Sequence, residues 1–314
     1  MMQCICPLCS NQTEVIIETL DAQLISNLYR ERFDLDVASN FGDVKHVYLM
    51  HCCWCDLRFF APSIEGAEEF YKSLGEKPWY YESIKEEYRV VAGFIAPGSS
   101  VLDVGCGIGH FFLYLTDSDY TGVEQNNDAV RKASELGRNV VCGNLAEHEK
   151  THFKRYNYVC CFQVFEHVEN IREFIESCFE LLLPDGELVL TVPSYDSYIS
   201  RVVNGVLNVP PHHLTWWSKK ALISLADNCG ISLMGLYDVS LMPSEYIRYS
   251  FYTALKYISD LTGSEKKVVD VSLGYKIRCI VALPVAAFIY VCLIFGAIRP
   301  AGHTVIARFT KAIH

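Results

Sequence analysis

Residues 101–110 read V-L-D-V-G-C-G-I-G-H, an apolar run that breaks into three glycines at alternate positions, Gly105, Gly107 and Gly109. An apolar run that enters a glycine turn is typical of a buried parallel strand. Glycine is needed where the backbone takes a positive φ or lies against a ligand. The stretch therefore predicts a strand, a tight turn and a small molecule that binds over the turn.

The spacing of the glycines narrows the class of ligand. A dinucleotide site has G-x-G-x-x-G, but here His110 stands at the last position and the third glycine comes one residue earlier. A second acidic residue, Glu124, follows the next apolar strand, 19 positions after Gly105. A carboxylate at that place can accept hydrogen bonds from both ribose hydroxyls, so the two features together predict a nucleoside ligand.

These features resemble the class I S-adenosylmethionine-dependent methyltransferases, whose first motif is an acidic residue followed by G-x-G-x-G and whose second strand ends in a ribose-binding acid. Four later stretches agree, and the resemblance covers residues 83–239. They are similar to the ends of the third and fourth strands, the fifth-strand motif and a substrate-side loop: 141–144 (V-C-G-N), 158–168 (Y-V-C-C-F-Q-V-F-E-H-V), 181–194 (L-L-L-P-D-G-E-L-V-L-T-V-P-S) and 213–218 (H-L-T-W-W-S).

The resemblance implies an α/β fold, a doubly wound Rossmann-like sheet of seven strands, and methyl transfer from S-adenosylmethionine to oxygen or carbon of a small or lipid-like acceptor. A saccharide, a nucleotide sugar and a quinone-like precursor all fit. The family commonly has aspartate where Asn144 and Asn157 stand, but Asn144 still offers an oxygen to the adenine amino group. The implied cofactor-binding residues are Asp103, Gly105, Gly107, Gly109, Glu124, Asn144 and Gln163.

The coarse pattern of the region alternates helices with short apolar strands, which specifies a parallel sheet covered on both faces. Ligands of such sheets bind at the carboxyl ends of the strands. The predicted strands are 100–104, 120–123, 139–141, 158–162 and 187–192. Helices are predicted before the first strand, between the first and second strands, between the second and third strands, and over 171–183.

Catalysis of methyl transfer needs mainly an aligned donor and acceptor, since the thioether leaves without protonation. A hydroxyl or carbon acid must also lose a proton, and histidine suits that task. His213, in P-P-H-H-L-T-W-W-S, is the candidate base and His212 the second choice, although the loop can also be a structural lid. Sugar C-methyltransferases have an H-x-H pair there. Glu166 and His167 receive no catalytic role, because they can simply order the following helix.

Two C-x-x-C knuckles lie near the N-terminus, and each can place two thiolates on one tetrahedral ion. Structural zinc held by Cys6, Cys9, Cys52 and Cys55 is the interpretation that we adopt. A redox pair and buried free thiols are the alternatives, and the competing ligands are Cys4, His51 and Cys53. The module resembles the N-terminal zinc-binding unit of several bacterial-type methyltransferases, including sugar C-methyltransferases.

The remaining sequence divides the chain into four parts. We expect a small zinc-ribbon-like module over 1–62, a linker with a helix at 64–74 over 63–81, the cofactor-binding domain over 82–240 and an apolar helical region over 241–314 that ends in a final sheet strand at 302–311. Residues 279–298 are twenty uncharged, mostly apolar residues, enough to span a bilayer. A strand that rejoins the sheet argues against a span. We therefore favour a hairpin-like or in-plane membrane association with a break at Pro284, and a true span and a buried core helix are the alternatives.

Composition limits the classes of function. The 314 residues are 51% hydrophobic, which is ample for a packed core, and carry a net charge of −10, which makes nucleic acid an unexpected partner. The sequence has fourteen cysteines and no signal-peptide pattern, which predicts a reducing compartment. Together with the apolar stretch 279–298, this predicts a protein at the cytoplasmic face of a membrane. The rival hypothesis is a non-catalytic interaction protein with a vestigial methyltransferase fold, which S-adenosylmethionine binding would distinguish.

Overall fold

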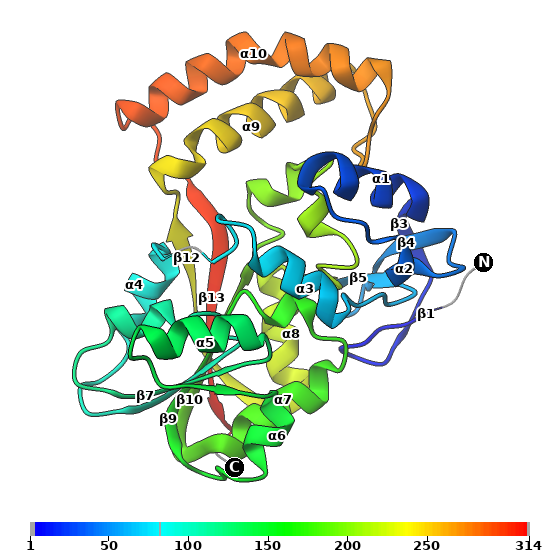
Figure 1. Ribbon diagram of the computed structural model, residues 1–314. Helices are drawn as coiled ribbons and strands as arrows, with labels where there is room; N and C mark the ends of the chain where they lie inside the picture. Colours follow the sequence, from blue (N-terminus) through cyan, green and yellow to red (C-terminus); the bar gives the residue numbers. More distant parts are fainter. Residues whose placement is uncertain (1–3, 82, 313–314) are drawn as a thin grey trace.

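The computed structural model describes residues 4–81 and 83–312, so the predicted boundaries at residues 1 and 82 lie outside the described residues. Its centre is a seven-stranded sheet in the order β12-β13-β10-β9-β6-β7-β8 (Figure 1). The five strands β10, β9, β6, β7 and β8 are parallel, and β13 is antiparallel to both of its neighbours, β10 and β12. The predicted doubly wound α/β fold is confirmed. The strands are β6 (Ser100–Val104), β7 (Asp119–Glu124), β8 (Val140–Cys142), β9 (Tyr156–Phe162), β10 (Leu182–Pro193), β12 (Ile231–Ser240) and β13 (Ala301–Lys311).

Helices cover this sheet, and they differ from the sequence pattern in two places. A short 3-10 helix, η1, follows the glycine turn instead of an α-helix, and α6 stands between β8 and β9, where no helix was predicted. The elements are α4 (Glu86–Ala92), η1 (His110–Tyr114), α5 (Asn127–Glu135), α6 (Leu145–Glu149), η2 (Phe165–His167), α7 (Ile171–Leu181), η3 (Tyr198–Arg201), η4 (Val206–Asn208) and α8 (Lys219–Cys229).

The N-terminal module is joined to the rest of the chain through its sheet. Strand β5 pairs with β4 on one side and with β11, which comes from the loop after β10, on the other. The module therefore shares a sheet with the predicted lid, which the sequence did not reveal. The linker helix α3 begins at Glu68, four residues later than expected. The elements are β1 (Cys4–Ile5), β2 (Gln12–Thr13), β3 (Val15–Asp21), α1 (Ala22–Phe33), α2 (Ala38–Phe41), β4 (His46–His51), β5 (Arg58–Ala61), α3 (Glu68–Gly75) and β11 (Thr215–Trp216).

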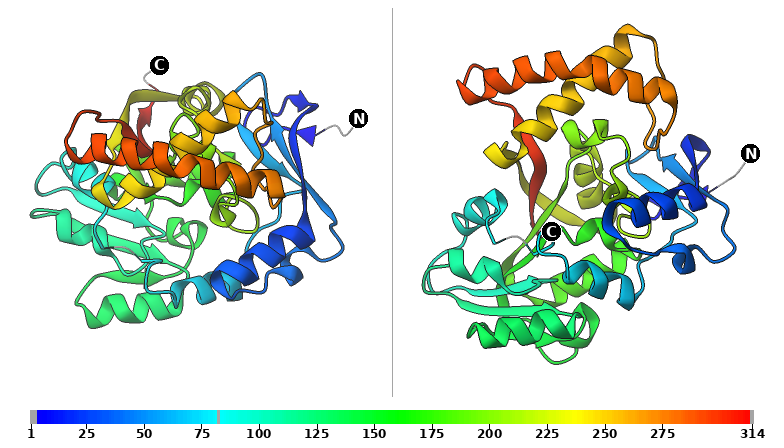
Figure 2. Two further views of the ribbon diagram at one scale, coloured as in Figure 1. Left: turned by 90° about the horizontal axis from the view of Figure 1, so that it is seen from above. Right: turned by 45° about the horizontal axis from the view of Figure 1, so that its top comes forward.

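Two long helices lie between β12 and β13 and form a layer at one end of the molecule (Figures 1 and 2). After η5 (Pro243–Glu245), α9 (Tyr246–Leu261) packs along α10 (Leu273–Ile294) through Ala254, Leu255, Ala282 and Ala286. The predicted break at Pro284 is wrong, because α10 runs through this residue as one helix. By length and composition α10 could cross a membrane, and only 17% of its most apolar stretch is buried in the protein.

Candidate active site

The turn after β6 needs glycine at all three predicted positions. Gly105, Gly107 and Gly109 have φ values of 65°, 56° and 70°, in the left-handed region. Side chains would also collide there: a Cβ on Gly105 would lie 2.6 Å from Val164, and one on Gly107 would lie 2.7 Å from the ring of Tyr81. Gly105 and Gly107 line a large cleft, so the turn offers bare backbone to a ligand.

Glu124, the last residue of β7, also lines the cleft. Its carboxylate accepts hydrogen bonds from the backbone amides of Gly107 and Asn126, both at 2.8 Å. These two bonds fix the orientation of the carboxylate beside the glycine turn. Each carboxylate oxygen has a further acceptor site, so Glu124 can still receive the two hydroxyls of a ribose. The bare turn and this oriented carboxylate fit a nucleoside such as that of S-adenosylmethionine.

Asp103 is buried and does not line the cleft, where a direct ligand of the cofactor would lie. It lies beneath the turn and is 2% exposed. Its carboxyl accepts a hydrogen bond of 3.0 Å from the Tyr120 hydroxyl, which lies against Gly109. Burial raises the pKa of Asp103 to about 7. This place suits a residue that orders the turn, and a contribution of Asp103 to cofactor binding stays a prediction.

Asn144 and Gln163 both line the cleft at the ends of their strands, and both already have partners. The side-chain oxygen of Asn144 caps α6 by accepting a hydrogen bond from the Glu147 amide at 2.9 Å. The Gln163 amide donates to the Thr304 hydroxyl at 3.2 Å, and its backbone has a positive φ of 56°. Binding of adenine by Asn144 stays a prediction, and the oxygen that it would use is shared with the helix cap.

The cleft has a volume of about 1270 Å³, which exceeds the roughly 300–1,000 Å³ of typical single-ligand pockets. The glycine turn and Glu124 form one part of its wall. His212 and His213 belong to another part, together with Glu166 and His167 from η2. The cleft thus has room for a nucleoside cofactor and a second molecule, and the predicted base lines the same cleft as the glycine turn.

Burial keeps the groups of this second wall neutral. Nε2 of His213 lies 3.8 Å from Oε1 of Glu166, and both side chains are almost completely buried. Burial lowers the pKa of His213 well below the usual value for histidine, and it raises the pKa of Glu166 to about 8. A neutral imidazole has a lone pair that can accept a proton, but the same burial disfavours the imidazolium that would form, so the role of base stays a prediction.

Several aromatic residues of the cleft were not found from the sequence. The hydroxyl of Tyr80 lies 3.4 Å from Nε2 of His212, and Tyr81 packs against Gly107 and bonds to Asn126. Tyr71 lies edge-on to His167. The run W-Y-Y at 79–81 was the available signal, but it stands in a segment that we had interpreted only as a linker.

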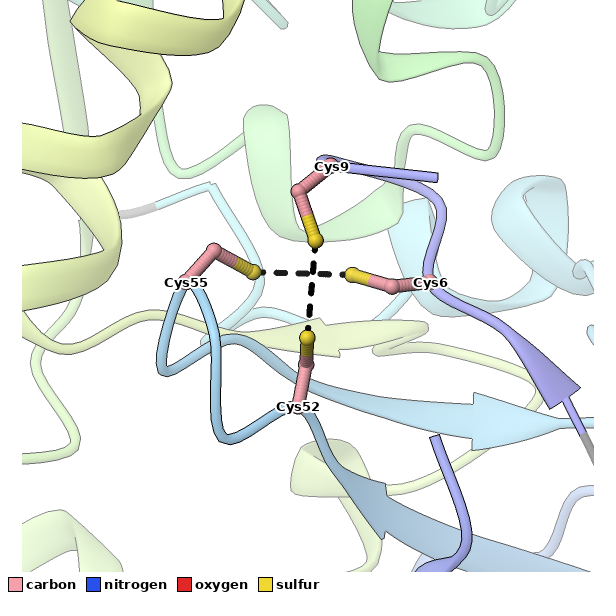
Figure 3. Close-up of side chains that lie close together, drawn as sticks. All are labelled: Cys6, Cys9, Cys52 and Cys55. Carbon is pink, nitrogen blue, oxygen red and sulfur yellow. Dashed lines mark hydrogen bonds between the residues drawn. The ribbon is translucent and has the colours of Figure 1, made fainter. Parts of the chain in front are cut away.

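The four cysteines of the two knuckles come together (Figure 3). The Sγ atoms of Cys6 and Cys55 are 3.5 Å apart, as are those of Cys9 and Cys52, and all four lie within 4.8 Å of one another. Sulfurs around tetrahedral zinc are about 3.8 Å apart, given Zn–S bonds of roughly 2.3 Å. The three competing ligands are absent from this group among the residues that the structure describes: Cys4, His51, whose ring bonds to Asp56, and the exposed Cys53.

Fold and site together define a nucleoside-binding α/β protein with a glycine turn at the carboxyl end of the first strand of its central sheet. Residues 79–234 match a family model described as a methyltransferase domain. The chain therefore belongs to the class I S-adenosylmethionine-dependent methyltransferases, as the motifs implied.

Curated relatives with similar sequences carry one name. The chain is 33% identical over 99 residues to the ubiquinone biosynthesis O-methyltransferase of Salmonella paratyphi A, covering 29% of this chain and 41% of that protein. It is 26% identical over 181 residues to the mitochondrial enzyme of that name from Bos taurus, covering 51% and 49%. The chain thus spans about half the length of the curated relatives that it matches.

Among solved structures, the chain is similar to an S-adenosylmethionine-dependent methyltransferase from Archaeoglobus fulgidus, with a TM-score of 0.47, 17% identity and coverage of 78% of this chain and 95% of that one. It is also similar to coclaurine N-methyltransferase, with a TM-score of 0.43, 15% identity and coverage of 79% and 82%.

Proposed function

We propose that this protein transfers the methyl group of S-adenosylmethionine to an oxygen or carbon atom of a small acceptor with an apolar part, such as a quinone-like precursor. The carrying observation is the single cleft that joins the glycine turn and Glu124 to a wall of buried acid–base groups. The relatives named for ubiquinone biosynthesis support this class of acceptor. The bound cofactor would supply an electrophilic methyl group, and the chain aligns the acceptor with it.

The test uses S-adenosylmethionine with an isotope-labelled methyl group, mixed with purified protein and an extract from cells that lack it. Labelled products separated by mass spectrometry then identify the acceptor. We expect a labelled phenol, enol or sugar ether, or its C-methylated counterpart. Binding of S-adenosylmethionine without any labelled product would favour the rival hypothesis of a non-catalytic interaction protein.

His213 is our candidate for removing the acceptor proton, and the corresponding prediction is a loss of turnover without a loss of cofactor. We expect His213→Ala to lower labelled product by about 10²–10⁴-fold, the usual contribution of general acid–base catalysis. Affinity for S-adenosylmethionine should change little, because a general base acts on the acceptor proton and not on the methyl donor. Calorimetry and the product assay measure the two effects. Unchanged turnover would leave His213 as a lid residue and transfer the test to His212.

The structure also supports a second proposal, that the protein associates with the surface of a membrane and that α10 does not cross the bilayer. Only six residues, and hence seven Cα–Cα steps, separate the end of α10 from the start of β13, which pairs with β10 and β12. They reach at most about 25 Å, less than the ~30 Å hydrocarbon core. The other end of α10 is held by Arg278, which bonds to Asp270 at 3.1 Å. Both ends therefore stay on the side of the sheet.

Exposed apolar side chains of α10 would enter the bilayer interface. Four exposed basic residues suit anionic headgroups: Lys266 and Lys267 before the helix, Lys276 near its beginning and Arg299 after it. Among the side chains that would insert are Ile280, which is 67% exposed, and Phe288, which is 70% exposed. The cleft also includes Arg248 from the first turn of α9. A lipid-like acceptor would then pass from the membrane surface to the cleft past this helix.

We predict that Ile280→Asp combined with Phe288→Asp abolishes flotation of the protein with vesicles of anionic phospholipid, and that deletion of residues 279–298 does the same. The matched control is Leu136→Asp, which should leave flotation unchanged. Leu136 is 57% exposed on the turn after α5 and is not part of α10. In sealed vesicles, protease at the non-cytoplasmic face should leave a C-terminal tag intact. Digestion of the tag from that face would establish a span and contradict the topology.

The metal part of the proposal is structural zinc at Cys6, Cys9, Cys52 and Cys55. The hydrogen bond between Cys6 and Cys55 lowers the pKa of Cys6 and raises that of Cys55, so one of the two sulfurs becomes a thiolate more easily than the other. Four protein ligands close the coordination shell, so the ion would stabilise the fold and would not reach the acceptor.

A further inference from the structure

Three histidines and one glutamate meet on the acceptor side of the cleft. His167, His212 and His213 each offer one ring nitrogen, and these atoms all lie within 4.8 Å of one another. Oε1 of Glu166 lies 4.0 Å from Nε2 of His167 and 3.8 Å from Nε2 of His213. The three imidazoles form a compact donor set, and the Glu166 carboxyl lies beside two of them. The helix η2 and the loop after η4 supply these side chains from two separate parts of the chain.

Two of the rings are held in the tautomer that a metal ligand needs. Nδ1 of His167 bonds to the backbone carbonyl of His212, and Nδ1 of His212 lies 3.0 Å from the carbonyl of Leu207. A carbonyl only accepts hydrogen bonds, so each Nδ1 carries the proton and each Nε2 keeps its lone pair. A backbone carbonyl on the second ring nitrogen is the usual support of a metal-binding histidine.

Glu166 supplies an independent sign that a ligand is needed here. Its side chain is 1% exposed, and neither carboxylate oxygen has a hydrogen-bond partner. A buried carboxyl group without hydrogen-bond partners is costly, whereas Asp103, another buried acid, receives a hydrogen bond from Tyr120. A cation between Glu166 and the imidazoles would satisfy the orphaned oxygens and use the free lone pairs.

We propose that Glu166, His167, His212 and His213 bind one divalent transition-metal cation at the acceptor side of the cleft. Imidazole and carboxylate ligands together suit ions such as Zn²⁺, Fe²⁺, Co²⁺ and Ni²⁺. The hydroxyl of Tyr80, 3.4 Å from Nε2 of His212, makes a weak contact that the cation would displace. This inference rests on the proposed function and deepens it. An acceptor hydroxyl that binds to the cation would lose its proton more easily. His213 would then be a metal ligand and not the general base.

The experiment titrates Co²⁺ into full-length protein whose cysteine cluster is already loaded with zinc. We expect one further equivalent of Co²⁺ to bind, with visible d–d absorption and without a sulfur-to-cobalt charge-transfer band, because the donors are nitrogen and oxygen. Glu166→Gln should weaken this binding at least about tenfold, and His167→Gln should do the same. Calorimetry with S-adenosylmethionine checks that each variant keeps its folded cofactor site.

The matched control is His148→Gln, since His148 is also buried but bonds to Tyr156 outside the cluster. It should leave Co²⁺ binding unchanged. The inference is overturned if no Co²⁺ binds beyond the thiolate site, or if Glu166→Gln and the wild-type protein bind it equally well. Neither result depends on turnover, so the proposal of methyl transfer would survive with His213 as the base.

Discussion

Replacing Glu124 by alanine is expected to weaken S-adenosylmethionine binding by at least about 100-fold. Two charge-assisted hydrogen bonds from ribose hydroxyls contribute roughly 1.5–3 kcal/mol each, and their joint loss exceeds the 1.4 kcal/mol that equals a tenfold change in affinity. The variant also loses the acceptor of the Gly107 and Asn126 amides, so the turn becomes less ordered. Isothermal calorimetry measures the effect directly.

Asp103 variants separate positioning from direct contact. Asp103→Ala removes the acceptor of the Tyr120 hydroxyl beneath the turn and should also abolish useful affinity. Asp103→Asn keeps an oxygen in the same place. It should restore most of the binding, because the buried carboxyl does not line the cleft. Wild-type-like binding by Glu124→Ala would remove the ribose assignment, and failure of Asp103→Asn to rescue would return Asp103 to the ligand contacts.

The central sheet could be predicted because its signals are local. Short apolar runs that end in glycine or an acid mark the strands, and the positive φ values at Gly105, Gly107 and Gly109 are what the motif requires. The final strand 302–311 was also expected, from its resemblance to the last strand of the methyltransferase fold, and β13 lies next to β10. The break at Pro284 was wrong because packing of α10 against α9 outweighs the hydrogen bond that proline removes.

The acceptor side could not be predicted in the same way, because its parts are distant in sequence. Glu166 and His167 stand about 45 positions before His212 and His213, and only the folded chain shows that their side chains meet. The sequence motif predicted His213 as the candidate base. It gave Glu166 only the role of ordering the following helix. Whether a buried carboxylate has a partner is a property of the tertiary structure, and no spacing rule reveals it.

The N-terminal module contributes to the site through contacts that a separate ribbon would not make. The Phe60 amide donates to the carbonyl of Leu214, and the Ser218 hydroxyl, which caps α8, bonds to Asp56 beside the second knuckle. Cys6, Cys52 and Cys55 belong to the same core as Trp217 and the strands of the central sheet. The cysteine cluster thus supports the loop that carries His212 and His213.

Loss of zinc should therefore destabilise the whole protein and impair the acceptor side more than the cofactor side. Structural zinc contributes roughly 10–16 kcal/mol in isolated zinc fingers, and we expect Cys52→Ser or chelation to lower Tm by more than about 10 °C. Metal analysis should give one zinc per wild-type chain in this cluster and none in the variant. The matched control is Cys53→Ser, since Cys53 is exposed in the same knuckle and outside the cluster. Where the variant remains folded, turnover should fall before S-adenosylmethionine affinity does, because the module contacts the loop of His213 and Ser218. A Cys52→Ser protein with normal zinc content and Tm would refute the site.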